Sequence, residues 1–436
     1  MSTTPQINLP PEPRSIEETG LSLGFLAELV LKTIYVRSLS KGHEIAEAVH
    51  LPFANVVAPV LDYLRHEHLT EVRGSTGFGE SSYLHVICDD GRMRARELME
   101  QNQYIGPAPV RLEEYTQVVK QQALSEQTIT RATLRNTLKH LVIGNEIISE
   151  LGPAINSAKS IFLFGNPGNG KTSIAEAIGL SLPGAILIPY AVTVHDSIIR
   201  VFDGLHHREI PEATSSTPTT NQTQTTRRYD RRWVVIRRPL IAIGGELRLS
   251  SLELVYDPTK KYYEAPYQMK ANGGAFLMDD FGRQPVSPRE LLNRWIVPLE
   301  KRVDYLILAT GHKINVPFDV LIIFATNLNP KDLVDEAFLR RIRYKIHVAD
   351  PTWDEFREIF KRETAKRSIP YADEGLRYLV MEYYVKTNRK PRGVHPRDIL
   401  DELVDIAHFE GVRPTLSKEL IDRACRAYFI KEESSK

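Results

Sequence analysis

The spacing of apolar residues divides the chain into three regions with different predicted structures. In the first region, apolar positions recur every three or four residues in several segments, which predicts amphipathic helices, and two other segments have strand-like composition. The predicted helices cover 25–35, 42–49, 53–68 and 91–101, and the predicted strands cover 69–72 and 83–87. The last region, 353–430, has helical spacing almost throughout.

In the middle region, short apolar runs alternate with helical segments. The runs at 160–164, 275–278 and 320–325 predict buried strands, and 172–180 predicts a helix after the first of them. A sheet whose strands are apolar on both faces must have both faces shielded from water. This alternation of strands and helices therefore predicts a parallel sheet between two layers of helices. The predicted fold class is α/β.

Composition and proline positions suggest the domain boundaries. The polar, proline-rich start predicts a flexible tail over 1–19. Residues 20–105, with three helices and a two-stranded wing, resemble a winged-helix domain. Pro107 and Pro109 predict a linker helix over 106–130. The α/β core is then expected over 131–349 and a small helical domain over 350–436.

A long insertion is expected inside the core, over 207–270. Residues 214–226 are only Ser, Thr, Asn, Gln and Pro, a composition that predicts disorder because it buries too little apolar surface. Residues 247–254 and 262–269 then predict the two strands of a hairpin.

The overall charge and the cysteines exclude several classes of protein. The chain of 436 residues has 56 Lys and Arg against 55 Asp and Glu, so a net charge of +1 gives no general attraction to nucleic acid or anionic lipid. Its 2 cysteines, Cys88 and Cys425, suggest neither a disulfide framework nor a zinc site. We expect a cytoplasmic protein, because this cysteine usage fits a reducing compartment. We expect no membrane insertion, because no apolar run approaches the roughly 20 residues of a membrane helix.

The strongest chemical signal lies between the first predicted core strand and its helix. The sequence from Gly165 to Thr172 matches the pattern G-x-x-x-x-G-K-[ST] of a phosphate-binding loop. Its glycines let backbone N–H groups surround phosphates, and the lysine reaches the β and γ oxygens of a nucleotide. The expected ATP-binding residues are Gly165, Asn166, Pro167, Gly168, Asn169, Gly170, Lys171, Thr172 and Ser173.

Two carboxylates follow the second predicted core strand. Asp279 and Asp280 come directly after the apolar run 275–278. Asp279 and the hydroxyl of Thr172 are the expected Mg²⁺ ligands, and Asp280 is placed to orient or deprotonate an attacking water.

With these motifs in this order, residues 141–430 resemble the AAA+ ATPases. The resemblance implies that Val142 and Ile143 line an adenine pocket and that Asn327, after the strand 321–326, is the polar sensor 1 residue. It implies that Arg340 or Arg341 reaches a neighbouring subunit as an arginine finger, and that Arg397 is sensor 2. The family usually has Asp-Glu where this chain has Asp279-Asp280, so hydrolysis is expected to be slow.

A predicted hairpin over 303–308 and 314–317, just before sensor 1, resembles the pre-sensor-1 hairpin branch of the family. That branch includes MoxR-like chaperones. The resemblance implies a homo-oligomer, with a ring as the expected form, that uses ATP to remodel a protein partner whose identity the sequence does not give.

Two alternative functions remain open at this stage. One is a DNA-acting loader or regulator, and the other is an ATP-dependent assembly switch with slow hydrolysis.

An arginine-rich stretch interleaved with aromatic residues could bind nucleic acid or an acidic polypeptide, or could be a solvated hairpin. Its members are Arg227, Arg228, Tyr229, Arg231, Arg232, Trp233, Arg237 and Arg238. Residues 21–105 carry 8 basic and 11 acidic side chains, which argues against DNA binding by the winged helix.

Overall fold

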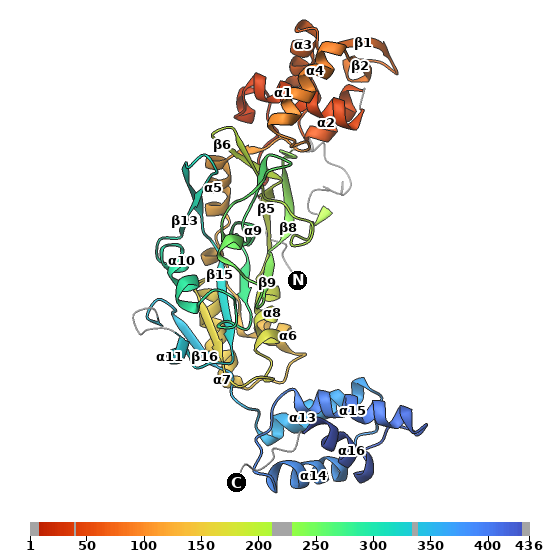
Figure 1. The fold of residues 1–436 in the computed structure, drawn as a ribbon, viewed down its shortest axis with the longest axis vertical. Helices are drawn as coiled ribbons and strands as arrows, with labels where there is room; N and C mark the ends of the chain where they lie inside the picture. The colour runs from red at the N-terminus through yellow and green to blue at the C-terminus, as the bar shows by residue number, and fades with distance from the viewer. Residues whose placement is uncertain (1–7, 39–40, 212–228, 334–338, 430–436) are drawn as a thin grey trace, which may run out of the picture.

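The computed structural model describes residues 8–38, 41–211, 229–333 and 339–429. The molecule is elongated (Figure 1), with α1 to α4 at one end, the β-sheets in the middle, and helices α13 to α16 at the other end. The segment 214–226 that we expected to be disordered, together with Arg227 and Arg228, lies outside the described residues.

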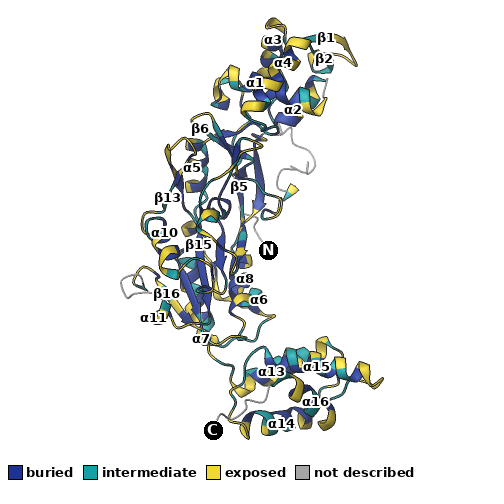
Figure 2. Ribbon diagram, in the orientation of Figure 1, coloured by how far each residue is buried: buried dark blue, intermediate teal, exposed yellow. Residues whose placement is uncertain are grey.

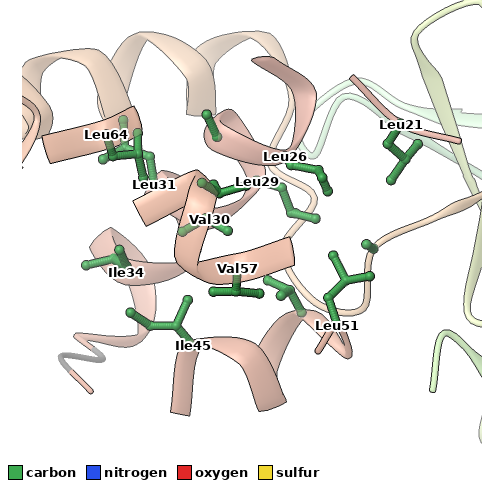
Figure 3. Close-up of a cluster of buried hydrophobic side chains, with 14 of the residues drawn as sticks. Leu21, Leu26, Leu29, Val30, Leu31, Ile34, Ile45, Leu51, Val57 and Leu64 are labelled. Carbon is green, nitrogen blue, oxygen red and sulfur yellow. The ribbon is translucent and has the colours of Figure 1, made fainter. Parts of the chain in front are cut away.

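The N-terminal region has the predicted order of helices and strands. It contains α1 (Leu23–Arg37), α2 (Gly42–Val49), a short π-helical turn (Phe53–Val57) that runs into α3 (Ala58–His66), the antiparallel pair β1 (Thr70–Ser75) and β2 (Tyr83–Ile87), and α4 (Asp89–Gln101). Figure 3 shows side chains such as Leu26 and Ile45 gathered between these helices. The same cluster includes Ala191, Ile198 and Tyr262 from the middle of the molecule, so the two parts share one core.

The main sheet has five parallel strands among the described residues. Their spatial order is β16 (Tyr344–His347), β4 (Ile161–Phe164), β15 (Leu321–Thr326), β12 (Ala275–Met278) and β9 (Leu240–Ile243). Side chains alternate between the two faces: Ile161 and Leu163 pack in one cluster, and Phe162 packs in another with Trp295. Both clusters consist of buried residues, and the ribbon of the main sheet is accordingly dark blue in Figure 2.

Helices cover both faces of this sheet. The first cluster takes side chains from α6 (Arg131–Leu138), α7 (Asn145–Asn156) and α8 (Lys171–Ser181), and the second from α10 (Pro288–Lys301). The predicted fold class, α/β with a parallel sheet flanked by helices, is therefore confirmed.

The insertion expected over 207–270 is not a separate unit: Leu240–Ile243 within it is strand β9 of the main sheet, and Val255–Asp257 and Tyr262–Glu264 join a second, mixed sheet. Its order is β10 (Val255–Asp257), β11 (Tyr262–Glu264), β7 (Ser197–Arg200), β6 (Ala191–Val194) and β3 (Val110–Arg111), and β5 (Ala185–Pro189) pairs with β8 (Trp233–Arg237) beside it. Four of these strands, β3, β5, β6 and β7, come before residue 207. The prediction of long strands at 247–254 and 262–269 is wrong: Leu249–Leu252 is a 3₁₀ turn, and α9 (Tyr267–Lys270) follows β11. Pro266, which has no N–H to donate, comes between β11 and α9.

The segment 106–130, expected as a linker helix, contains a helix but is packed against the second sheet. It includes α5 (Leu112–Gln121), whose side chains Leu112, Tyr115 and Val119 are buried in a cluster with strands of the second sheet. Main-chain atoms at Val110–Arg111 pair with β6. This segment is an integral part of the middle of the molecule.

A hairpin and a helical region complete the structure. The predicted hairpin is present as β13 (Val303–Ile307) and β14 (Lys313–Pro317) in antiparallel pairing. After β16 the chain forms α13 (Trp353–Lys366), α14 (Asp373–Val380), a π-helical turn (Met381–Val385), α15 (His395–Phe409) and α16 (Lys418–Tyr428). These helices enclose a core of their own, with Phe360, Leu403 and Ile421 among its members.

In the described part of the chain, no single helix has the length and apolar composition to cross a bilayer. Among the described residues, one bent pair of helices, Gly42–Val49 and Phe53–His66, is long and apolar enough when its two members are taken together, with a 97° bend at the break.

The arginine-rich stretch is largely structural where it is described. Arg232 is only 2% exposed and binds the Asp230 carboxylate at 2.7 Å. Its Nη1 also donates to the carbonyls of Thr19 (2.7 Å) and Pro109 (3.3 Å). Arg238 and Trp233 are buried as well. These three side chains therefore cannot form an exposed surface for a phosphate backbone.

We predict that Arg232→Ala lowers the free energy of unfolding by about 3 to 5 kcal/mol, because it leaves the buried Asp230 carboxylate without its cation. Arg231→Ala, at the neighbouring exposed position, is the control and should change it by less than about 0.5 kcal/mol. Denaturant unfolding measures both, and equal losses would contradict the structural role of Arg232.

Candidate functional site

The loop between β4 and α8 has the backbone that the sequence pattern predicts. Gly165, Gly168 and Gly170 have φ angles of 147°, 83° and 80°, and residues other than glycine rarely adopt such angles. Gly165 also lies close to the chain after β16, where a Cβ would stand 2.2 Å from the Val348 carbonyl oxygen. Conformation therefore favours glycine at all three positions, and at Gly165 the available space does so as well.

Lys171 lies at the centre of the site and is only 7% exposed. Its Nζ donates to the carbonyls of Gly165 (3.0 Å) and Asn166 (2.8 Å) and to Asn327 Oδ1 (2.6 Å). Burial lowers the pKa of Lys171, and the carboxylates of Asp279 and Asp280 oppose that shift. The ammonium group thus occupies a position inside the loop where it can meet an incoming phosphate.

Thr172 and Asp279 are in direct contact. The Thr172 hydroxyl donates to both carboxylate oxygens of Asp279, at 2.9 Å and 3.1 Å. Hydroxyl and carboxylate oxygens are the donors that Mg²⁺ accepts, usually with several waters retained. The pair therefore fits a magnesium ion bound together with a phosphate chain.

Asn327 connects the lysine to the second carboxylate. It follows β15, the strand that lies between β4 and β12 in the sheet. While its Oδ1 accepts from Lys171, its Nδ2 donates to Asp280 Oδ1 at 3.3 Å. Asp280 is exposed and has a left-handed backbone with φ of 48°. Asp is one of the few side chains that adopt this conformation readily.

These residues border a cavity of about 530 Å³. The predicted adenine-pocket residues Val142 and Ile143 line it, as does Arg397 from α15. Its size lies in the range of small-molecule sites, roughly 300 to 1,000 Å³. The cavity therefore lies between two groups of residues. One comprises the predicted loop with Asp279, Asp280 and Asn327, and the other belongs to the C-terminal helical region.

The predicted arginines have different positions. Arg397 Nε donates to Asp398 Oδ1 at 2.9 Å beside the cavity. Arg340 and Arg341 are not among the described residues that line the cavity, and Arg341 binds Glu300 Oε1 at 2.6 Å. The location of Arg340 and Arg341 therefore does not support a role for either at the phosphate-binding loop of the same chain.

Sequence reasoning missed several side chains near the site. Arg362 and Lys366 line the cavity from α13, and the Asp350 carboxylate accepts hydrogen bonds from Asn166 and Asn169. Arg362 and Lys366 belong to an ordinary amphipathic helix pattern, and Asp350 follows a short strand. None of them lies in a recognisable motif.

Sequence comparisons with known proteins give a match to the C-terminal region. A family model described as a domain of unknown function (DUF8689) matches residues 352–427, which are the helices α13 to α16. No curated protein matches the chain in sequence.

Solved structures resemble the chain at low identity. The structure of NtrX from Brucella abortus is 14% identical, with 71% of this chain and 56% of that chain covered and a TM-score of 0.38. RuvB from Thermotoga maritima, titled a Holliday junction branch migration motor, is 13% identical, with 68% and 73% covered and a TM-score of 0.38. The match thus spans little more than half the length of NtrX.

We predict that Lys171→Ala removes the binding of magnesium pyrophosphate and of ATP. Either ligand should raise the melting temperature of the parent protein, because a ligand that binds only the folded state stabilises it. The variant should lose that increase. Lys159→Ala, at an exposed position before β4, is the control and should keep it. An unchanged increase in the Lys171 variant would contradict the assignment of this loop.

Proposed function

We propose that the protein is an AAA+ ATPase that binds ATP with Mg²⁺ in this cavity and hydrolyses it. The observation that carries the proposal is the continuous set of contacts from Asp280 through Asn327 to Lys171 in a cavity that also contains the Thr172 and Asp279 pair. A lysine, a hydroxyl, a paired carboxylate and a second carboxylate are the groups that phosphoryl transfer to water requires.

Each residue has a distinct role in this proposal. The loop N–H groups and Lys171 hold the phosphate chain and stabilise the charge that develops on it. Thr172 and Asp279 hold Mg²⁺, which neutralises phosphate charge when bound. Asn327 orients the attacking water, and the Asp280 carboxylate accepts its proton. Arg397 adds positive charge from the C-terminal helices, which act as a lid.

The finer points of the proposal concern assembly and partners. We assign the protein to the pre-sensor-1 hairpin, MoxR-like branch, because the β13–β14 hairpin directly precedes the Asn327 strand. We propose a cytoplasmic homo-oligomeric ring in which Arg340 or Arg341 reaches the cavity of the next subunit. We propose that the output is the remodelling of a protein, with the N-terminal region as a winged helix that contacts protein. The burial of Arg232 and Arg238 supports this choice over DNA.

We predict that Asp280→Asn lowers the rate of ATP hydrolysis by about 100-fold or more, because an amide cannot accept the proton of water. The variant should still bind ATP, since Lys171 and Thr172 are unchanged. Asp280→Glu should raise the rate if the shorter carboxylate limits it. Steady-state phosphate release, with ATP affinity measured in parallel, tests both, and a parent protein that binds ATP without turnover would favour the assembly switch.

We predict that Arg340→Ala and Arg341→Ala combined lower turnover by about 1,000-fold, the scale of an arginine finger. Mixing this double variant with Lys171→Ala subunits should restore measurable turnover, because an intact cavity then faces an intact arginine pair. The lack of any restoration, in a mixture shown to form joint oligomers, would exclude action between subunits.

A further inference from the structure

Asp350 lies where the phosphate-binding loop, the main sheet and the C-terminal helices meet. It follows β16, whose pairing with β4 is extended by a hydrogen bond from the Val348 N–H to the Phe164 carbonyl (2.8 Å). Two residues later, the Thr352 hydroxyl caps α13 by accepting from the Glu355 N–H. Asp350 is therefore the junction between the sheet and the first helix of the C-terminal region.

Both asparagine side chains of the loop donate to the Asp350 carboxylate. Asn166 Nδ2 lies 2.9 Å and 3.0 Å from its two oxygens, and Asn169 Nδ2 lies 2.8 Å from Oδ1. Burial acts to raise the pKa of Asp350, but these amides and the charges of Lys390 and Arg392 outweigh it and lower the pKa. The group is thus an anion at neutral pH and accepts from both side chains.

Asn169 binds the C-terminal region with its other amide atom. Its Oδ1 accepts from the Gly393 N–H at 3.2 Å, in the segment before α15. Gly168 also lies close to Val394, because a Cβ added at the glycine would stand 2.5 Å from Val394 Cγ1. The loop is therefore held between Asp350 on one side and residues 393–394 on the other.

We propose that Asp350 is a positioning residue that joins the phosphate-binding loop to the C-terminal helical region through Asn169, and so couples nucleotide occupancy to the position of that region. A phosphate chain would draw Lys171 away from the Gly165 and Asn166 carbonyls. The resulting shift of the loop is passed to Gly393 through Asn169 and to α13 through Asp350. The nucleotide half of this inference rests on the proposed function.

The first test measures ADP affinity. Asp350→Ala should raise the Kd of ADP about tenfold, within the usual range of coupling between sites. Asp350→Asn should give an intermediate value, because its amide oxygen accepts one hydrogen bond while its NH₂ group opposes the second donor. Asp354→Ala, an exposed carboxylate at the start of α13, is the matched control and should leave the Kd unchanged.

A double-mutant cycle distinguishes direct coupling from a general structural loss. Asn169→Ala should also raise the Kd, and the variant with both Asp350→Ala and Asn169→Ala should be no weaker than the weaker single variant. Additive effects would overturn the proposal. If Asp350→Ala does not fold, the pair Asp350→Asn and Asn169→Ala completes the same cycle.

The second test needs no nucleotide. Spin labels are attached at Glu176→Cys on α8 and at Asp405→Cys on α15, both exposed positions. The distance between the two labels reports how the C-terminal helices lie relative to α8, which packs on the main sheet. Cys88→Ser removes background labelling, and Cys425 is buried. Asp350→Ala should broaden the distance distribution, whereas Asp354→Ala should not.

The two tests fail independently. An unchanged distance distribution in Asp350→Ala would overturn the positioning role. A parent protein that binds no ADP would overturn the proposed function and the coupling to nucleotide, but the distance distribution would still show whether Asp350 holds the C-terminal region in place.

Discussion

The parallel pairing of β4, β15 and β12 is the constraint on which the site depends. Because parallel strands end at the same edge of a sheet, the residues that follow them are brought together although they are far apart in sequence. Here the edge gathers Lys171, Asn327 and Asp279. The buried side chains of the strands on both faces hold this alignment, so the core that stabilises the sheet also sets the geometry of the site.

The parts of this site that were predicted from sequence are those with local signals. The glycine pattern around Lys171 and the apolar run before Asp279 each require only a few adjacent residues, because a turn and a strand end are local structures. Asn327 was predicted only through a family resemblance. Its place between Lys171 and Asp280 depends on strand order, which adjacent residues do not encode.

The parts that were not predicted depend on distant partners. The role of Arg232 depends on carbonyls of Thr19 and Pro109, more than 100 residues away, so its charge alone suggested an exposed cluster. Asp350 acquires its role only when β16 pairs with β4. The strand predicted over 262–269 is an exception, because the reason that it ends early is local: Pro266 follows β11 and is the N-cap residue of α9.

The core shared by the N-terminal region and the second sheet has a mechanical consequence. Ala191, Ile198 and Tyr262 pack in the same cluster as Leu26 and Ile45. Moving α1 to α4 away from the second sheet would expose this apolar surface to water. The free-energy cost is about 25 cal/mol for each Å² exposed. The N-terminal region is therefore expected to move together with the second sheet, so that any rotation of the middle of the molecule would displace the distant β1–β2 pair by a larger amount (Figure 1).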